Sequence, residues 1–390
     1  MLAWLGRVDP TTVGIAFGLA GLAMTAVIAL LARVGDWTRS LSWWVGAAFC
    51  LTAGYMLNMA QTHLLQAWTM AISNPLTIVG ACLFYVGVRH VEGKPAVLLQ
   101  IAPIIVLSIV GNVLFVVIWP SLPARVFVQL LCLLIVTYLN VSALRKLDHG
   151  YYHFPARFLL IANAALVLLL FARGAIVFFF DEPVTAVQRT PVTALVFSVA
   201  GFLILMFLVG ILLICFAEKQ TLLRRLATED YLTGALNRLG LRDTLATWPA
   251  GRAGVVTLFD IDHFKRVNDS FGHETGDELL RVFARGLLNT APEGAIIARL
   301  GGDEFCVVEQ TAAGVFSSDW IKTLKRQLAT QLTLPTAVAH SCRVSHGSAA
   351  FADATRDFTQ ALRSADSALY RSKARKLLRD KQPIAAQARV

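Results

Sequence analysis

Two groups of acidic residues in the C-terminal half of the sequence could bind a divalent cation. Asp260 and Asp262 come directly after the run 255–259, which is typical of a buried strand, and Asp303 and Glu304 come after a pair of glycines. Carboxylate oxygens at strand ends suit Mg²⁺, which keeps several waters and shares the phosphates of its substrate. Each group alone is a weak signal, because an Asp-x-Asp sequence is more often a surface turn. Together they predict a metal site built from two separate segments.

Glycines and lysines close to these carboxylates indicate a phosphate ligand. Gly301 and Gly302 stand directly before Asp303, and residues without a Cβ let a polyphosphate approach the backbone closely. Lys265 and Lys373 could pair with phosphate oxygens. The combination predicts metal-assisted phosphoryl or nucleotidyl transfer.

The elements that must position these residues alternate between strand-like and helix-like segments. Apolar runs on both sides of the Gly301-Gly302 turn predict a hairpin, and apolar residues at three- and four-residue spacing predict helices. The expected strands are 255–259, 296–300, 305–308 and 342–345, and the expected helices are 275–288 and 358–376. In this order they predict an α+β domain whose helices pack on a central, largely antiparallel sheet.

Four segments of this region stand in an order and spacing that a known family shares. They are 230–238 (DYLTGALNR), 259–277 (FDIDHFKRVNDSFGHETGD), 299–305 (RLGGDEF) and 365–373 (ADSALYRSK). With these segments the sequence resembles the GGDEF-type diguanylate cyclases over about residues 226–376. The resemblance implies an enzyme that joins two molecules of GTP into cyclic di-GMP with release of pyrophosphate.

The resemblance also implies a role for each matching acidic position. Asp303 and Glu304 correspond to catalytic positions, with Asp303 accepting the proton of the attacking 3′-hydroxyl group and Glu304 assisting with metal or phosphate. Asp260, Asp303 and the backbone carbonyl of Ile261 correspond to metal ligands. The expected cofactor is Mg²⁺ or Mn²⁺, with two ions in each active site. A metal that lowers the pKa of the hydroxyl group would let Asp303 serve both as ligand and as base.

Five further positions correspond to residues that bind the substrate. Asn268 and Asp277 match the pair that recognises guanine, since a carboxylate can accept from N1–H and the 2-amino group while an amide can donate to a guanine acceptor. Adenine would leave these groups unpaired, which can give strong discrimination. Phe264, Lys265 and Lys373 match positions that line phosphate and ribose. The alternative is that Asn268 only caps the next helix and Asp277 only holds its first turn.

Two departures from the family pattern lie near Lys373 and in the last expected strand. Members often continue after this lysine with two residues, a glycine and an arginine that contacts phosphate, whereas this sequence has Lys376 and Leu377 at those places. Arg375 or Lys376 could take over the phosphate contact, and the sequence leaves both open. His346 stands where an aliphatic residue is common, and we find no physical reason for it in the sequence.

The N-terminal half has the composition of a membrane protein. Of the 390 residues, 56% are hydrophobic and only 15% are charged, whereas a soluble domain carries about a quarter charged residues. A membrane-crossing helix needs about 20 mostly apolar residues. Seven segments qualify: 13–31, 41–59, 68–88, 97–119, 126–144, 158–180 and 194–216. The third is the least regular because Asn74 and Pro75 interrupt it, and neighbouring helices would have to satisfy the backbone group freed by the proline.

Positive residues predict the orientation, because cytoplasmic loops carry an excess of Lys and Arg. One set of connections holds Arg33, Arg39, Arg89, Lys94, Arg145, Lys146, Arg157, Lys219, Arg224 and Arg225, and the opposite set holds only Arg7, Arg125 and Arg189. Seven spans with this bias place the N-terminus outside and the C-terminal domain in the cytoplasm, and the resemblance implies the bacterial inner (plasma) membrane. Much of the net charge of +10 then lies beside the lipid bilayer, so no nucleic-acid partner is expected.

Arg173 is a charged residue inside the sixth expected span, where a charge near the bilayer centre costs at least ~2.5 kcal/mol. It could face other helices or a cavity and contact an unknown signal ligand at the membrane domain. It could also extend toward the outer interface, because Asp181 and Glu182 follow about two turns later. Arg173 is therefore a candidate sensor residue, and the sequence leaves both interpretations open.

The sequence divides into four expected parts. Residues 1–216 should form a seven-helix transmembrane sensor domain, 217–229 a signalling helix, 230–378 the GGDEF-type domain and 379–390 a disordered tail. We expect a homodimer, because bond formation needs two facing sites that each hold one GTP, and we expect the sensor to act through the geometry of that dimer. Two alternatives are a catalytically silent GGDEF-like receptor and a transporter or receptor with an incidental soluble tail.

Overall fold

The chain forms two compact units, Met1–Thr221 and Leu222–Val390, which we call the helical unit and the sheet unit. The computed structural model describes residues 10–34, 39–59, 66–95, 98–179, 191–311, 318–330 and 343–380.

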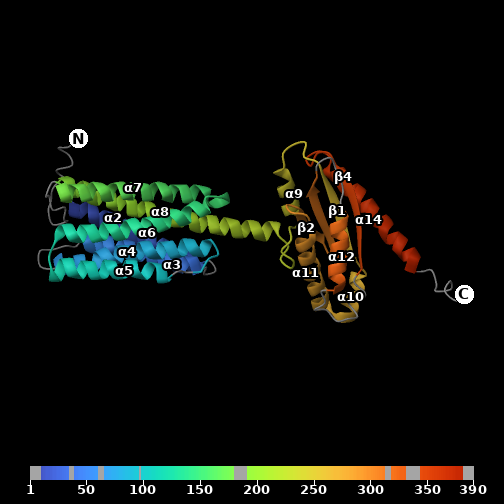
Figure 1. Ribbon diagram of the computed structural model, residues 1–390, viewed down its shortest axis with the longest axis horizontal. Coiled ribbons are helices and arrows are strands. Elements are labelled where there is room, and N and C mark those ends of the chain that lie inside the picture. Colours follow the sequence, from blue (N-terminus) through green and yellow to red (C-terminus); the bar gives the residue numbers. More distant parts are fainter. Residues whose placement is uncertain are drawn as a thin grey trace, which may run out of the picture. The chain divides into compact units, whose positions relative to one another are not determined.

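Long helices that lie side by side make up the helical unit (Figure 1). Within the described residues, seven helices are long and apolar enough to cross a membrane, which confirms the predicted number of segments. They are α2 (Pro10–Val34), α3 (Arg39–Met59), α4 (Gln66–Val91), α5 (Leu98–Val113), which continues as the π-helical turn Leu114–Ile118, α6 (Leu122–Leu144), α7 (His153–Phe179) and α8 (Pro191–Thr228). Two short 3₁₀ turns, Arg145–Leu147 and Gly150–Tyr152, lie between α6 and α7.

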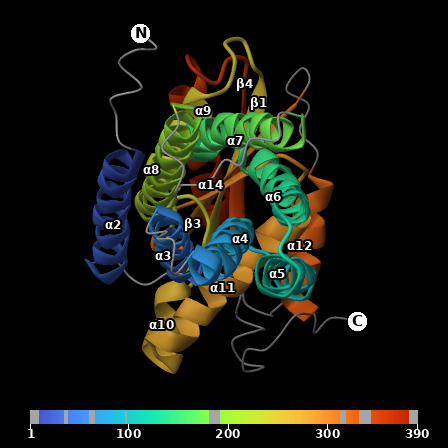
Figure 2. The same cartoon turned by 90° about the vertical axis from the view of Figure 1, so that its left-hand side faces the viewer.

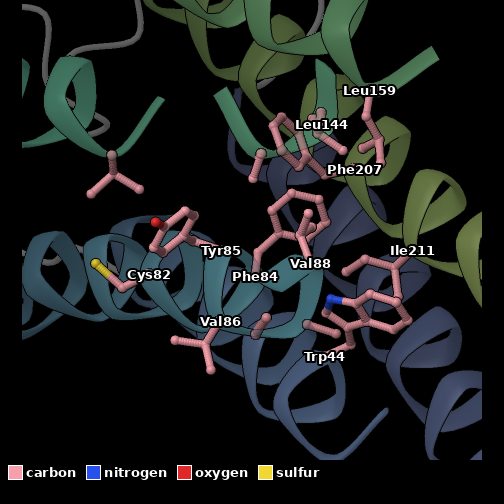
Figure 3. Packing of buried hydrophobic residues seen from close by; sticks show 14 of the residues in the cluster. Trp44, Cys82, Phe84, Tyr85, Val86, Val88, Leu144, Leu159, Phe207 and Ile211 are labelled. Atoms are coloured by element: carbon pink, nitrogen blue, oxygen red, sulfur yellow. The ribbon is translucent and has the colours of Figure 1, made fainter. Parts of the chain in front are cut away.

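Helix α4, the predicted irregular span, is continuous through Pro75 and is the most extensively buried of these helices. Seen end-on, it lies between α3 and α5 (Figure 2). Gly87 lets α3 come close, because a Cβ added there would lie 2.1 Å from Trp44 Nε1. Buried side chains around Trp44 and Phe84 form the core of the unit (Figure 3). The helices are therefore held together by apolar packing of whole faces.

Helix α8 runs without interruption from Pro191 to Thr228. The segment 217–228 lacks proline and glycine, the residues with the poorest helix propensity. The prediction that the seventh span continues as a helical linker is therefore confirmed up to Thr228.

The sheet unit contains a four-stranded sheet with strand order β2-β3-β1-β4. Its strands are β1 (Gly254–Asp262), β2 (Ile296–Gly301), β3 (Glu304–Gln310) and β4 (Arg343–Phe351). All three pairings are antiparallel, as predicted. Its helices are α9 (Arg238–Ala246), α10 (Phe264–Phe271), α11 (His273–Thr290), α12 (Asp319–Thr330) and α14 (Phe358–Asp380).

The two faces of the sheet carry different helices because side chains alternate along each strand. Phe259 of β1 packs with buried residues of α11 and α12. Its neighbour Leu258 packs with buried residues of α9 and α14. The α+β architecture with helices on a central sheet is thus confirmed.

Two predicted boundaries need correction. Strand β4 runs on to Phe351, well past the expected end at residue 345, because its whole length pairs with β1. Helix α14 ends at Asp380, so residues 379 and 380 are helical and do not belong to a disordered tail. The other residues of the expected tail, and Cys342, lie outside the described residues.

Candidate active site

Asp260 lies near the end of the central strand β1. Only 6% of the residue is exposed, because β1 has a hydrogen-bonded neighbour on each side. In the register of the sheet, its partners are Glu304 on β3 and Ser345 on β4. A carboxylate in such a place costs free energy unless it has a charged or hydrogen-bonding partner.

The hairpin between β2 and β3 brings Asp303 to the same edge of the sheet. Gly301 and Gly302 have φ values of 146° and 54°, conformations that glycine adopts without steric cost. The tight turn leaves Asp303 one residue before Glu304, the partner of Asp260. Because paired residues of antiparallel strands have Cα atoms only about 4.5–5.5 Å apart, the two acidic segments meet.

The chain turns sharply between β1 and α10. His263 has φ 61° and ψ 25°, in the left-handed region that few residues with side chains adopt. It is the N-cap of α10, and no side chain caps this helix end by a hydrogen bond. The first backbone N–H groups of a helix lack acceptors within the helix and attract anions. The start of α10 can therefore bind a phosphate.

These elements line a cavity of 340 Å³, within the usual range of ligand pockets, ~300–1,000 Å³. Its lining residues are Asp260, Ile261, Asp262, His263, Phe264, Lys265, Asp303, Arg343, Lys373 and Lys376. The structure thus brings together the predicted metal residues and three predicted substrate residues. Asn268, Asp277 and Glu304 are not among the lining residues.

Lys373 on α14 contacts the more buried of the two carboxylates, with 2.5 Å between its Nζ and Asp260 Oδ2. Burial raises the pKa of the Asp260 carboxyl group, and the negative charges of Asp303 and Asp262 raise it further, against the opposing effect of Lys373. Lys373 is thus placed to neutralise Asp260 or to bind a phosphate oxygen beside it.

The Asp303 carboxyl group also has a raised pKa, chiefly because it is partly buried. Two carboxylates with raised pKa values fit a divalent cation, because a cation would compensate both burial and repulsion. Within the described residues, no group of three or more His, Cys, Asp or Glu side chains is arranged to hold a metal. A pair of carboxylates is enough for Mg²⁺, which commonly binds one or two of them together with substrate phosphates. Asp260 and Asp303 therefore fit this ion.

Asn268 and Asp277 lie on the two consecutive helices α10 and α11. Gly276 allows the helices to approach, because a Cβ added there would lie 1.8 Å from Asn268 Oδ1. This oxygen is buried and has no hydrogen-bond partner in the described part of the chain. Gly272, the N-cap of α11, has no side-chain capping bond. Asn268 is therefore not the side-chain cap of that helix, which removes one of its two interpretations.

Glu304 leaves the same face of the sheet as Asp260, because the two residues are paired across strands. It lines a separate groove of 750 Å³ between α9 and α14. Its predicted assistance to metal or phosphate therefore stays a prediction.

The comparison with protein families bears on these same segments. The family described as "Diguanylate cyclase, GGDEF domain" matches residues 227–378. These residues form a diguanylate cyclase GGDEF domain. The match extends from the last turn of α8 through most of α14 and includes the described strands β1 to β4.

The GGDEF domain is similar to parts of two proteins of Escherichia coli (strain K12). The probable diguanylate cyclase DgcF is 35% identical over 161 residues, which cover 40% of this chain and 50% of that protein. The cyclic di-GMP phosphodiesterase PdeR is 34% identical over 165 residues, which cover 40% of this chain and 24% of that protein. The chain thus spans half or less of the length of these relatives.

A solved structure is also similar to part of this chain. It contains the coiled coil and GGDEF domain of DgcB from Caulobacter crescentus in complex with c-di-GMP. Its sequence identity with this chain is 28%, it covers 41% of this chain and 87% of its own, and the TM-score is 0.36.

Lys376 and Arg343 add two cations to the cavity of the GGDEF domain. Lys376 Nζ donates to Asp262 Oδ2 at 2.6 Å, to Val344 O at 3.0 Å and to Ser345 Oγ at 3.0 Å. Arg343 is the β4 partner of Asp262. Of the two predicted substitutes for the missing arginine, only Lys376 lines the cavity. Our sequence reasoning missed Arg343, and only the register of β4 against β1 could have identified it.

His346 on β4 now has a physical explanation. Its ring stacks on Phe259, with centroids 6.0 Å apart, and its Nδ1 lies 3.1 Å from Lys325 Nζ. Burial, followed by the charges of Lys325 and Lys376, lowers the pKa of His346 to about 4. A neutral imidazole can pack on the aromatic ring and accept from the lysine, which an aliphatic residue could not do.

The opening segment of the GGDEF domain holds the hairpin in place. Asp230 accepts two hydrogen bonds from Arg299 Nη1, at 2.9 and 3.1 Å. Arg299 in turn donates to the carbonyl of Gly302 from Nε and Nη2, and Arg238 Nε donates to Leu300 O at 2.6 Å. This network ties the end of α8 to the turn that carries Asp303.

Proposed function

We propose that the chain is a membrane-bound diguanylate cyclase, which condenses two GTP into cyclic di-GMP and releases pyrophosphate. The observation that carries the proposal is that Asp260 and Asp303, from two separate segments, line one cavity with Lys373. The alignment with a probable diguanylate cyclase over this domain supports it.

The residues of the cavity divide the work of nucleotidyl transfer between them. Lys265, Lys373 and the first N–H groups of α10 bind the phosphates, and Phe264 packs beside them. The 3′-oxygen of one GTP attacks the α-phosphorus of the other, so that a phosphodiester bond forms and the bond to pyrophosphate breaks. Asp303 accepts the hydroxyl proton, and its raised pKa suits this task because a general base works best when its pKa approaches the working pH. The same step repeated in the opposite direction closes the ring.

Divalent cations, Mg²⁺ or Mn²⁺ and two per site, would be held by Asp260, Asp303 and the Ile261 carbonyl. When bound, they neutralise phosphate charge and acidify the attacking hydroxyl group. Glu304 assists from the neighbouring strand position.

Guanine recognition falls to Asn268 and Asp277. The unpartnered, buried Oδ1 of Asn268 supports this role, because a buried acceptor without a donor costs about 1–3 kcal/mol. A guanine amino group would supply the donor. Asp277, half-buried on the first turns of α11, would accept from N1–H.

The helical unit would anchor the enzyme in the bacterial inner membrane. Arg33, Arg89, Lys94, Arg145 and Arg157 lie at the ends of helices on the side that we assign to the cytoplasm. With seven spans this places the N-terminus outside and the GGDEF domain in the cytoplasm.

Control by the sensor would operate through a homodimer. Each GGDEF domain binds one GTP, so two copies must face each other across a two-fold axis. The exposed leucines Leu222, Leu223 and Leu226 on α8 could pair with a second copy of this helix. The signal at the helical unit would change how the two domains meet.

The test is turnover of GTP by the full chain in lipid nanodiscs with Mg²⁺, with cyclic di-GMP quantified. Asp303→Ala should lower the rate at least about 100-fold, because it removes a base and a metal ligand together. Asp319→Ala is the matched control, since Asp319 is exposed on α12 and lies outside the cavity. Equal product from wild type and Asp303→Ala would reject the proposal.

A second candidate is a silent domain that binds GTP without turning it over. The similarity to PdeR, a phosphodiesterase, supports this second candidate, because a similar region occurs there in a protein with a different activity. Saturable GTP binding without product in the same assay would favour this alternative.

A further inference from the structure

A second cavity lies inside the helical unit, among α3, α4, α6, α7 and α8. Its volume is 140 Å³, close to the ~150 Å³ of an engineered apolar cavity that binds benzene. Most of its lining is apolar, and it includes Phe84 and Phe207, whose rings meet edge to face with centroids 5.8 Å apart (Figure 3). The body of a ligand in this space would therefore be small and apolar.

One end of this cavity is cationic. Arg173, Gln129 and Asn74 line both this cavity and an adjoining one of 20 Å³, which Arg125 also lines. Arg125 Nη1 donates to the sulfur of Met70 at 2.8 Å, and a thioether is a weak acceptor. No carboxylate is among the described lining residues of either cavity. Two guanidinium groups in an apolar surrounding, with no opposite charge among the lining residues that the structure describes, favour an anionic ligand.

Polar atoms along the cavity also lack partners. In the described part of the chain, Arg173 Nε, Gln129 Oε1, Asn140 Oδ1 and Asn163 Oδ1 are buried without a hydrogen bond. Asn140 and Asn163 are only 2% and 1% exposed. Each such atom costs free energy, so a ligand that supplies an acceptor to Arg173 would recover part of it.

The cationic part of the cavity lies toward the end of the helical unit at which α8 begins. Arg173 is near the end of α7, whereas Arg125 and Gln129 are near the start of α6 and Asn74 is near the start of α4. This is the end at which α8 begins, opposite to Thr228. On the topology proposed above, it is the outer end, where an external compound would enter.

We propose that the helical unit binds a small monocarboxylate, whose carboxylate pairs with Arg173 and whose apolar body fills the cavity toward Phe84 and Phe207. Arginine presents a planar fork that matches a carboxylate with two hydrogen bonds. The main cavity has a single guanidinium group and a mostly apolar lining. It therefore suits a ligand with one negative charge better than it suits a phosphate. The proposal is independent of cyclase activity, because it concerns only the helical unit.

The test is equilibrium binding of labelled benzoate and butyrate to the full chain in nanodiscs, without GTP, with benzamide and butyramide as uncharged counterparts. The carboxylates should bind saturably, and each amide should bind at least about tenfold more weakly, since hydrogen bonds to a charged group are stronger than those between neutral groups. Arg173→Gln should weaken carboxylate binding by a similar factor. Arg157→Gln, on the same helix but exposed and paired with Asp148, should leave it within about twofold.

Ala200→Leu provides a variant that keeps every polar group. Ala200 lines the cavity, so a larger side chain there should fill the space and abolish binding while the protein still folds. Ala200→Leu and the two amides test whether the cavity binds a carboxylate even if Arg173→Gln does not fold. Equal affinity for acid and amide, binding unchanged in Ala200→Leu, or no saturable binding of either carboxylate would overturn the proposal.

Discussion

At the scale of single residues, Lys376 binds three acceptors at the wall of the cavity. Its ammonium group reaches a carboxylate, a backbone carbonyl and a hydroxyl, so all three of its N–H donors have acceptors. It thereby holds Asp262 at the wall of the cavity and joins α14 to β4. Its contacts thus position Asp262, and its positive charge lies beside the cavity that we propose to bind phosphates.

We predict that Lys376→Met lowers the free energy of unfolding of the sheet unit by about 1–2 kcal/mol, because Asp262 loses its charged donor. Asp262→Asn combined with Lys376→Met should cost less than the sum of the two single changes, with a coupling of at least about 0.5 kcal/mol. Chemical denaturation of the four proteins measures this cycle. Additive effects would show that the ion pair contributes nothing.

Asp303 gives a prediction about pH. Its raised native pKa means that the folded protein holds this proton more tightly than the unfolded chain does. Stability from this group is therefore present at low pH and is lost as the pH rises through the native pKa. Asp303→Asn should raise the Tm of the metal-free protein at pH 7.5, and the gain should shrink as the pH falls and disappear below pH 3.8, the ordinary pKa of the group.

Calorimetry of the full chain in nanodiscs with a chelator measures this difference. Asp319→Asn is the control. Its change in Tm at pH 7.5 should have the opposite sign, because Lys322 lowers the pKa of this exposed carboxyl group. A gain from Asp303→Asn that stays constant with pH would contradict the assigned cause.

At the scale of elements, the contact between β4 and α14 positions both cavity lysines. A Cβ added at Gly347 would lie 2.2 Å from the backbone nitrogen of Leu369 and 2.3 Å from the carbonyl oxygen of Ala365. Neither atom belongs to a flexible side chain, so the helix itself would have to move. Lys373 and Lys376 lie one and two turns beyond Leu369 on the same helix.

We therefore predict that Gly347→Ala destabilises the sheet unit by about 1–3 kcal/mol through overpacking. It should also lower turnover of GTP, because Lys373 moves with α14. Ala350→Ser, at an exposed position of the same strand, should change neither quantity. Full turnover in Gly347→Ala would show that the lysines do not depend on this contact.

At the scale of the whole molecule, the proposed dimer makes the two copies depend on each other. If each product molecule needs two competent half-sites, then a random mixture of equal amounts of wild type and Asp303→Ala contains only roughly a quarter fully active dimers. We predict that co-assembly lowers total activity to about that fraction of the fully wild-type preparation. Cyclic di-GMP production after subunit exchange in nanodiscs measures it. A fall to one half would indicate independently active copies.

The sequence by itself determined the elements and led to the chemistry that we propose for the site. Long apolar runs indicated the seven helices, because a span is defined by length and composition alone. The chemistry was carried by short motifs, of which the glycines before Asp303 and the acidic residues after β1 are the clearest. Such patterns are local, so they can be recognised in the sequence without any knowledge of how the chain packs.

Only the tertiary structure decided which distant residues meet. Lys376 reaches Asp262 through the docking of α14, and Arg343 is paired with Asp262 only through the register of β4 against β1. No periodicity in the sequence encodes a register between strands so far apart. The position of Arg173 beside a cavity was likewise decided only by the tertiary structure. Helix α7 is apolar on all sides, so its sequence has no polar stripe to indicate which face is buried. The cavity beside Arg173 exists because five helices pack around it, and packing is a property of the folded chain.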